Sequence, residues 1–518
     1  DRSAGVRKNS GKAIQLVNRN ASMEIYERIQ QLYEEEAGGR AVQFEGQWWT
    51  WGDLARLGEG IHAALNAKGV ASGRGVGLVL RQRPQGLGSY LALIGTRRCA
   101  VLITPIQPDQ SMGEELQTLR LPVLIAEKED WEREGLIDAA RHAGTVGILI
   151  TGSKERPIKL IDELSEIGPE PRYEPLENTA VTILTSGTTG RPKRVPYSFD
   201  HLRGQPPANP RPIEQRGVNI AAVPLASLGG ILGMASAVWR GRAYSLMDRF
   251  DVWKWAELVK EHKPRRLGAP PAAVRMLLDE KVPKEYMESG QVFSAASAPL
   301  DQATADEFER VYGITVVRAY GATEFLGAIT AFSDSDLQLA KEKRGSVGRA
   351  VPGCSIRIVD PDSGEELPAG DIGLREADPP KRPADTPDGW IRTNDLARMD
   401  EDGYIWIVGR ADGVIIRGGF KVPSEEVADI LIGHEAVSEA AVVGLPDPRL
   451  GQLPVAAVVL RPGFECSESE LKAWVKARKP GYCVPASVVF VDELPRNHMM
   501  KVIPGEVVKL VSENLEAD

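Results

Sequence analysis

The sequence predicts an α/β protein in which a large first domain of several subdomains is followed by a small α+β domain. The chain has 518 residues, which is more than a single hydrophobic core usually organises. From Arg40 onward, short β-rich runs alternate with helical stretches, the pattern of βαβ units around a sheet. After Arg410 the order changes to a compact β-α-β-β-α-β pattern, which indicates a separate domain of about 100 residues.

The first part of the chain carries the alternation of strands and helices. A polar, aperiodic arm over residues 1–20 precedes a first helix expected at Met23–Glu36. The runs AVQFEG and GVGLVL are expected as strands on either side of a helix at Asp53–Lys68. A later helix at Asp301–Tyr312 has Gly313 just past its end and leads into the β-branched run ITVV.

The last part of the chain changes in composition. Residues 376–389 concentrate prolines and acids, which predicts a connection before the strand-like runs WIRTND and YIWIVGR. Further helices are expected at Ser424–Ile432 and Glu468–Ala477, the second opening with Ser467 and Glu470 in capping-box spacing. The runs AAVVGL, VAAVVL and SVVFV are the expected strands of this small domain.

Composition argues against several classes of protein. The chain carries 63 basic and 72 acidic residues, a net charge of -9, so nucleic acid is not an expected partner. No apolar run approaches the roughly 20 residues that cross a bilayer, and the start DRSAGVRKNSGKAIQ lacks the apolar core of a secretory signal, so we expect a cytoplasmic protein without a membrane span. The runs GRGVG and GLGSYL do not give Gly-x-Gly-x-x-Gly after a strand, which argues against a nicotinamide-dependent dehydrogenase. The four cysteines are too few to stabilise a chain of this length by disulfide bonds and too far apart for a Cys-x-x-Cys site. They are therefore expected to be reduced and structural, and they are Cys99, Cys354, Cys466 and Cys483.

The most informative segment is Thr182–Lys193, TILTSGTTGRPK, where an apolar strand runs into hydroxyls and glycines and closes on cations. The glycines let backbone N–H groups converge on an anion, the hydroxyls donate further hydrogen bonds and the final lysine supplies charge. The spacing Gly-x-x-x-x-Gly-Lys-Ser/Thr of a P-loop is absent, and a solvated turn after a strand is the alternative. The residues expected to hold a polyphosphate are Thr185, Ser186, Gly187, Thr188, Thr189, Gly190 and Lys193.

The run TSGTTGRPK resembles the phosphate-binding signature of the AMP-binding, adenylate-forming superfamily of acyl-CoA synthetases, peptide-synthetase adenylation domains and luciferases. Counterparts of that family's motifs follow in order from about residue 20 to residue 510, and the closest resemblance is to free-standing acyl-CoA synthetases. The resemblance implies an adenylation domain at 21–410, a small mobile lid domain at 411–518 and ATP-dependent activation of a carboxylic acid as an acyl-AMP.

The segment RAYGATE follows the ITVV strand, at a strand end where α/β proteins tend to bind ligands. Tyr320 offers a flat face for adenine, and the Gly321 and Ala322 backbone allows close approach of a ligand. Thr323 can donate to a phosphate and Glu324 can hold Mg²⁺. The resemblance implies these same roles.

The resemblance assigns further nucleotide contacts to two other segments. In SAASAPL, the small residues Ser297, Ala298 and Pro299 are expected along the adenine. Asp395 in RTNDL and Arg410 in IVGR are expected to hold the ribose hydroxyls, a carboxylate being a natural acceptor for a diol.

The implied chemistry is attack of a substrate carboxylate on the α-phosphorus of ATP, with loss of pyrophosphate. Because both reactants are anions, the protein must align them and neutralise charge more than it must move protons. Lys501, in PRNHMMKVI, fits the family's lysine that bridges carboxylate and phosphate, and Thr188 and Glu324 complete the expected catalytic set. Met500 stands where the family usually has glycine.

The second half-reaction is expected at the domain junction. Asp412 resembles the hinge about which the lid domain rotates, and the loop IIRGGFKVPSEEV resembles the one that lines the coenzyme A site. An ordinary hairpin turn is the alternative for RGGFK. The residues assigned to coenzyme A are Arg417, Gly418, Gly419 and Phe420, and Lys421 is assigned to the nucleotide.

The acid pocket departs from the family pattern. In AAVPLASLGGILG, Ala226 and Ser227 occupy positions where the family usually has bulky ring-bearing residues, and Gly229 and Gly230 lie beside them. The lost volume predicts a large aromatic or polycyclic carboxylic acid. Arg194 replaces the glycine usual after Pro-Lys and adds a cation near the expected polyphosphate.

The acceptor of the acyl group stays open between coenzyme A, a carrier protein and an amine. Transfer to coenzyme A by a stand-alone enzyme is favoured, because no carrier module follows residue 510 and no condensation domain precedes residue 20. A nucleotide-binding regulator without turnover is the alternative from another class. The joint presence of Glu324, Asp395, Arg410 and Lys501 argues against it.

Overall fold

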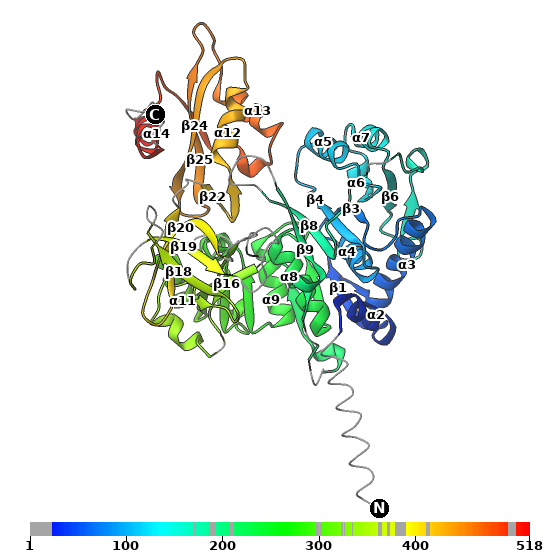
Figure 1. Ribbon diagram of the computed structural model, residues 1–518. Coiled ribbons are helices and arrows are strands. Elements are labelled where there is room, and N and C mark those ends of the chain that lie inside the picture. The colour runs from blue at the N-terminus through cyan, green and yellow to red at the C-terminus, as the bar shows by residue number, and fades with distance from the viewer. Residues whose placement is uncertain are drawn as a thin grey trace, which may run out of the picture. The chain divides into compact units, whose positions relative to one another are not determined.

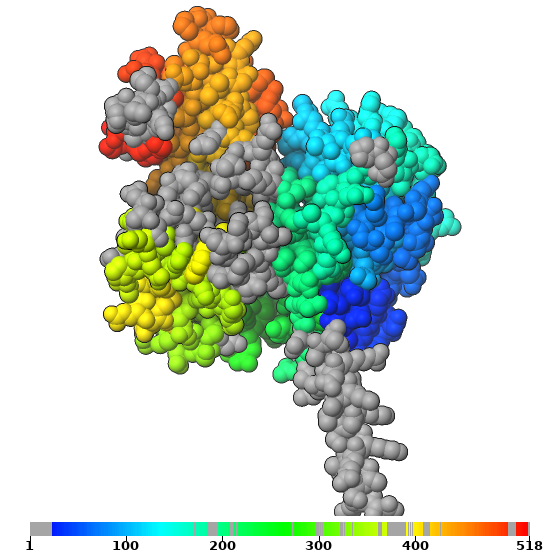
Figure 2. Space-filling model, viewed as in Figure 1, coloured from blue at the N-terminus to red at the C-terminus, as the bar shows by residue number. Residues whose placement is uncertain are grey.

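A computed structural model gives the structure of the chain as two compact units (Figures 1 and 2; residues outside the described set are grey). The first unit takes the described residues of Asp1–Pro105, Met112–Leu184 and Arg194–Leu258, and the second those of Ile106–Ser111, Thr185–Lys193 and Val259–Asp518. The described residues are 23–169, 172–185, 193–204, 206–207, 211–296, 300, 302–322, 325, 327–333, 335–360, 365–369, 373–378, 390–410, 415–495 and 504–517.

A seven-stranded sheet is the framework of the first unit, with the strand order β7-β6-β5-β3-β4-β8-β9. Strands β3, β4 and β5 are buried along their whole length, which explains their near-continuous apolar sequences. The pairs β3–β4, β3–β5, β4–β8 and β5–β6 are parallel, and β7 is antiparallel to β6. The strands are β3 (Gly75–Val79), β4 (Cys99–Ile103), β5 (Val123–Glu127), β6 (Val146–Ile150), β7 (Ile158–Leu160), β8 (Thr179–Thr185) and β9 (Lys193–Ser198).

A second sheet in this unit has the order β10-β11-β1-β2, and helix α4 contacts β3 and β4 as well as β1. Its strands are β1 (Arg40–Phe44), β2 (Gln47–Thr50), β10 (Val218–Ile220) and β11 (Ala243–Leu246). The helices of the chain up to residue 262 are α2 (Ile25–Glu35), α3 (Trp51–Ala67), α4 (Pro84–Gly95), α5 (Asp109–Leu119), α6 (Lys128–Trp131), α7 (Leu136–Ala143), α8 (Leu228–Arg240) and α9 (Val252–His262). The two helices predicted near residues 23–36 and 53–68 are thus confirmed as α2 and α3.

The second unit contains three small sheets before residue 411. Strands β12, β13 and β14 are parallel, with α10 and α11 in the connections, and the predicted ITVV strand is confirmed within β14. The two other sheets, β15-β16-β17 and β18-β19-β20-β21, are antiparallel. The elements are β12 (Arg266–Ala269), α10 (Pro271–Asp279), β13 (Val292–Ala295), α11 (Gln302–Tyr312), β14 (Thr315–Arg318), β15 (Tyr320–Ala322), β16 (Gly327–Ala331), β17 (Arg349–Ala350), β18 (Ser355–Val359), β19 (Gly373–Asp378), β20 (Ile391–Met399) and β21 (Ile405–Arg410).

The connection predicted at residues 376–389 begins too early. Residues 376–378 belong to β19, where Glu376 lies between Arg357 of β18 and Arg392 of β20 in the strand register. The remainder of the predicted connection, 379–389, lies outside the described residues.

The C-terminal part of the second unit is a five-stranded sheet with helices on both faces (Figure 1). Alternate residues of β25 point to two different cores: Ala456 and Val458 pack with residues of α12 and α13, and Val455 and Ala457 pack with residues of α14. The predicted β-α-β-β-α-β order is therefore present, with one extra hairpin strand and a final helix. The elements are β22 (Ile415–Arg417), β23 (Phe420–Val422), α12 (Ser424–Ile432), β24 (Val437–Asp447), β25 (Gly451–Leu460), α13 (Glu468–Lys476), β26 (Ser487–Phe490) and α14 (Pro504–Ala517).

The four cysteines are free, as predicted. Burial raises the pKa of Cys99 and Cys483 to about 12, so both thiols stay protonated and serve as small apolar side chains. Among the described residues, the helices are all too short or too polar to cross a membrane.

The predicted cap of α13 gives a direct test of the small domain. The Ser467 hydroxyl accepts a hydrogen bond from the Glu470 backbone N–H at 3.2 Å. We expect Ser467→Ala to lower the free energy of unfolding of the C-terminal transition by about 1 kcal/mol. Urea unfolding followed by tryptophan fluorescence measures it, since Trp474 lies on α13.

The control for this experiment is Ser424→Ala. Ser424 also begins a helix, α12, but its hydroxyl makes no hydrogen bond within the described part of the chain. Equal losses in the two variants would contradict the capping role of Ser467.

Candidate functional site

The predicted phosphate loop is bracketed by two neighbouring strands. Thr185 is the last residue of β8 and Lys193 is the first of β9. The backbone of Ala322 and of Arg410 is likewise placed, at the ends of β15 and β21. The other predicted residues that lie outside the described set are Ser186, Gly187, Thr188, Thr189, Gly190, Ser297, Ala298, Pro299, Thr323, Glu324, Asp412 and Lys501.

The predicted adenine and ribose residues meet in the second unit. The Tyr320 hydroxyl on β15 donates a hydrogen bond to Oδ2 of Asp395 on β20. Asp395 lies directly opposite Arg410 in the register of β20 and β21. The backbones of three predicted site residues from segments up to 90 positions apart, Tyr320, Asp395 and Arg410, thus lie on neighbouring strands or are linked by a side-chain hydrogen bond.

The Asp395 side chain is held in a mostly buried position, with a residue exposure of 6%. Burial of a carboxylate is costly unless hydrogen bonds satisfy its oxygens. The Tyr320 hydroxyl supplies one such bond. The predicted role of Asp395 as an acceptor for the ribose hydroxyls stays a prediction.

Gly321 has a structural role beside Tyr320. A Cβ at this position would lie 2.3 Å from the Gly327 carbonyl oxygen and 2.6 Å from the Ala328 Cα of β16. A side chain would therefore force β15 and β16 apart. The predicted close approach of this backbone to a ligand stays a prediction.

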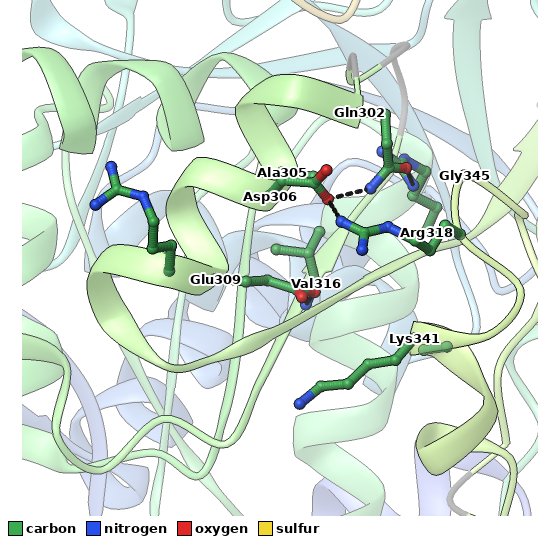
Figure 3. Close-up of a pocket in the computed structure, with 11 residues that line it drawn as sticks. Gln302, Ala305, Asp306, Glu309, Val316, Arg318, Lys341 and Gly345 are labelled. Carbon is green, nitrogen blue, oxygen red and sulfur yellow. Dashed lines mark hydrogen bonds and ion pairs between the residues drawn. The ribbon is translucent and has the colours of Figure 1, made fainter.

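A cavity of about 330 Å³ is lined by residues of α11, of β14 and of the segment 340–345 (Figure 3). Arg318 at the end of β14 donates to the Leu300 carbonyl at 3.1 Å and to the Gln302 side-chain oxygen at 3.1 Å. Gln302 in turn donates to Asp306 at 2.6 Å, a bond drawn in Figure 3. Because Leu300 follows Ser297–Pro299 and Arg318 precedes Tyr320, this network ties together the two segments expected to contact adenine.

The same network carries an ion pair on the rim of the cavity. Asp306 forms an ion pair with Arg344. The hydrogen bond from Arg344 has the largest effect on the pKa of the Asp306 carboxyl and the one from Gln302 the next largest, and both hold that pKa below its usual range. Glu309 accepts the Val316 backbone N–H at 2.7 Å. Sequence reasoning missed Arg318, because its partners lie on a neighbouring helix and no local pattern links them.

The predicted coenzyme A loop is a tight hairpin. Gly418 and Gly419 connect β22 to β23 with φ of +57° and +87°, the conformation that a two-residue hairpin turn requires. The Arg417 guanidinium donates to the Tyr482 and Val484 carbonyls at 3.0 and 3.1 Å, and the Phe420 ring stacks on Tyr482 at 4.4 Å. The predicted hairpin turn is confirmed, Arg417 is hydrogen-bonded to the backbone of the small domain, and the coenzyme A assignment of this loop stays a prediction.

Lys421 sits on β23 opposite Ile416 and is partly buried. Phe420 is 38% exposed. All the residues assigned to this loop, Arg417 included, are at least partly exposed, and their assigned ligands stay predictions.

The acid-pocket segment leads into helix α8. The Ser227 hydroxyl caps the helix by accepting the Gly230 N–H at 3.1 Å, and it also donates to the Pro224 carbonyl at 2.6 Å. A Cβ on Gly230 would lie 2.3 Å from that same carbonyl oxygen, so the backbone of 224–225 fills the space that this glycine vacates. At Gly229 an added Cβ would meet only ordinary contacts of 3.5 Å or more. Ala226 is partly exposed and Gly229 is exposed, and their role in an acid pocket stays a prediction.

Gln82 holds this segment in place and was not predicted. Its amide nitrogen donates to the Met247 carbonyl at 2.9 Å, and its amide oxygen accepts the Leu225 N–H at 3.1 Å. It therefore bridges the end of β11 and the turn before α8.

One group of described side chains has the composition of a metal site. Ligand atoms of His434, Cys466 and Glu470 lie within 4.8 Å of one another. However, His434 Nδ1 accepts the Ala436 N–H at 3.3 Å, and burial, with the Glu470 hydrogen bond, raises the pKa of Cys466 to about 11. Both effects oppose the deprotonated thiol and free imidazole nitrogen that a metal needs.

Comparison with known proteins matches two family models. Residues 30–374 match the AMP-binding enzyme family, and residues 426–501 match the AMP-binding enzyme C-terminal domain. A sulfoacetate–CoA ligase of Cupriavidus necator is 30% identical over 478 residues, which cover 88% of this chain and 91% of the relative. A 2-succinylbenzoate–CoA ligase of Bacillus pumilus is 26% identical over 479 residues, covering 89% and 93%.

Solved structures share the fold. The amide bond synthetase McbA from Marinactinospora thermotolerans superposes with a TM-score of 0.79, covering 94% of this chain and 99% of that one at 24% identity. At that identity the similarity establishes the fold, a large first domain and a small second one.

The hydrogen bond from Tyr320 to Asp395 can be tested with Tyr320→Phe, which keeps the ring and removes the hydroxyl. Loss of one charge-assisted hydrogen bond to a buried carboxylate is expected to weaken ATP binding about tenfold. Isothermal titration of the full chain with Mg-ATP measures the affinity.

Tyr312→Phe is the matched control, because the Tyr312 hydroxyl donates to the Leu277 and Val282 carbonyls at 3.0 and 2.9 Å inside the same unit. It should lower the melting temperature and leave ATP affinity unchanged. Unaltered affinity in Tyr320→Phe would mean that the hydroxyl does not prepare Asp395 for the nucleotide.

Proposed function

The chain belongs to the AMP-binding enzyme family, and from that premise we propose that it is an AMP-forming acyl-CoA ligase acting on a bulky carboxylic acid. The observation that carries the proposal is the convergence of Tyr320, Asp395 and the Arg410 backbone at one place. The CoA ligases among the relatives, which align along about nine-tenths of the chain, support the same activity.

The proposed reaction has two steps. The substrate carboxylate attacks the α-phosphorus of ATP to form an acyl-AMP and release pyrophosphate. The thiol of coenzyme A then attacks the acyl carbon, forming a thioester and releasing AMP. Asp395 and Arg410 orient the ribose while Tyr320 packs on the adenine, so that the α-phosphorus faces the acid.

Charge is the main obstacle to the first step. Lys501 is proposed to lie between the carboxylate and the α-phosphate, and the loop from Thr185 to Lys193 to hold the leaving pyrophosphate. Glu324 offers a hard carboxylate oxygen of the kind that Mg²⁺ prefers, and a bound ion would neutralise phosphate charge. Coenzyme A is assigned to the β22–β23 hairpin, with Gly418 and Gly419 admitting its pantetheine arm.

Acid-dependent exchange of pyrophosphate into ATP tests the first step. The panel should include a small sulfonated acid, acetate, long-chain acids and aromatic and polycyclic acids, and exchange is expected with the bulky ones. Lys501→Ala should lower the rate by a factor on the order of 10² to 10³, whereas Lys509→Ala, at an exposed lysine of α14 paired with Glu506, should not.

The acceptor is tested with the acid that exchanges best. Thioester formation with coenzyme A, and not amide formation with added amines or acylation of a carrier protein, is the expected result. Binding of ATP without exchange for any acid would contradict the ligase proposal and favour a regulator.

The size of the acid pocket is tested by Ala226→Phe. The added ring should abolish exchange with aromatic acids and leave exchange with acetate within about threefold, because it fills the room that this position leaves. Ala67→Phe, at an exposed position at the end of α3, controls for added surface hydrophobicity. Equal activity of Ala226→Phe toward bulky acids would place the acid elsewhere.

A further inference from the structure

Arg194 is a buried cation whose guanidinium joins four elements of the first unit. It is the second residue of β9, and its side chain is only 13% exposed. One nitrogen, Nη1, donates to the Leu102 carbonyl of β4 at 3.0 Å and contacts the Thr182 hydroxyl of β8 at 3.4 Å. The other, Nη2, forms an ion pair with Glu115 of α5, which is also 13% exposed.

This arrangement changes the expectation for Arg194. The sequence predicts an added cation near the polyphosphate. In the structure, the Arg194 guanidinium binds acceptors within the first unit, the Leu102 carbonyl and the Glu115 carboxylate. A planar guanidinium can hold several acceptors in fixed directions, which a lysine ammonium or the glycine typical of the family cannot. The positive charge of Arg194 therefore stabilises the packing of neighbouring strands and a helix in the first unit.

The position of the ion pair connects it to the phosphate loop. Strand β8 enters the loop and its neighbour β9 leaves it. The contact from Arg194 to Thr182 links these two strands three residues before the end of β8 and one residue after the start of β9. The Arg194 guanidinium therefore links β9 to β8 and β4 close to the strand ends that bracket the loop.

We propose that the Arg194–Glu115 ion pair is a positioning device that fixes strands β8 and β9, whose end residues Thr185 and Lys193 are assigned to the polyphosphate, and thereby strengthens ATP binding. The proposal rests on the nucleotide role assigned to residues 185–193. Holding the ends of a binding loop before the ligand arrives removes ordering cost from the binding step. The pair acts through the loop and does not touch ATP.

The test compares Mg-ATP binding to the full chain for the parent and four variants, by isothermal titration without acid or coenzyme A. Arg194→Gly and Glu115→Gln should each weaken binding about tenfold, the value of one charge-assisted hydrogen bond. Arg194→Lys should weaken binding less than Arg194→Gly, by about threefold, because it keeps the positive charge near Glu115 and loses the fork that also holds Leu102 and Thr182. Glu115→Gln keeps the size and shape of the side chain. It therefore tests the proposal by itself if Arg194→Gly does not fold.

The fourth variant, Glu36→Gln, is the matched control. Glu36 pairs with Arg216 at 2.7 Å in the same unit, with side-chain exposures of 26% and 10%. It should lower the melting temperature as Glu115→Gln does and leave ATP affinity at the parent value. In the exchange assay, Glu115→Gln should raise the KM for ATP and leave the KM for the acid unchanged.

Three outcomes would overturn the proposal: parent affinity in Arg194→Gly and Glu115→Gln, equal weakening in Glu36→Gln, or equal weakening in Arg194→Lys and Arg194→Gly. Absence of acid-dependent exchange would contradict the ligase proposal only, because the binding measurement needs neither acid nor acceptor. The two proposals can thus fail separately.

Discussion

The burial of the Asp395 carboxylate is the constraint on which the nucleotide site depends. A carboxylate that is 6% exposed must be satisfied from inside the protein, and the Tyr320 hydroxyl from the neighbouring sheet contributes to that. The Tyr320 ring also packs against the cluster of Val347, Ile358 and Ala397 that joins the two antiparallel sheets. The packing between sheets and the geometry of the predicted ribose acceptor therefore cannot change independently.

Near the residues predicted to contact adenine, polar side chains likewise satisfy one another inside the protein and hold the backbone in place. Arg318 binds Leu300 and Gln302, and Arg344 pairs with Asp306. Each of these interactions holds a loop end next to a residue that is expected to contact the ligand. The interacting side chains are not themselves expected to contact it. Catalysis by alignment of two anions depends on such fixed positions more than on proton transfer.

What the sequence could predict follows from how local each feature is. The cap at Ser467, the helix end at Gly313 and the glycine turn at Gly418–Gly419 are set by residues a few positions apart, and all three are present in the structure. The motif positions Tyr320, Asp395 and Arg410 were found because their pattern resembles a known family. The partners of Arg194 and Arg318, by contrast, depend on which strands and helices become neighbours: Glu115 is 79 residues away from Arg194, and no periodicity encodes that pairing.

The acid-pocket segment shows why a missing side chain is not the same as free volume. Gly230 and Gly229 look equivalent in the sequence, but the turn at Pro224 and Leu225 folds back into the space beside Gly230. That turn is held by hydrogen bonds to Gln82 and to the Ser227 hydroxyl. Ser227 is smaller than the residue usual in the family, and it also fixes the start of α8. Of the two glycines, only Gly229 has space beside it for an added Cβ without a close contact. Side-chain volume counted along the sequence therefore overestimates the space at this segment, because the folded backbone fills part of it.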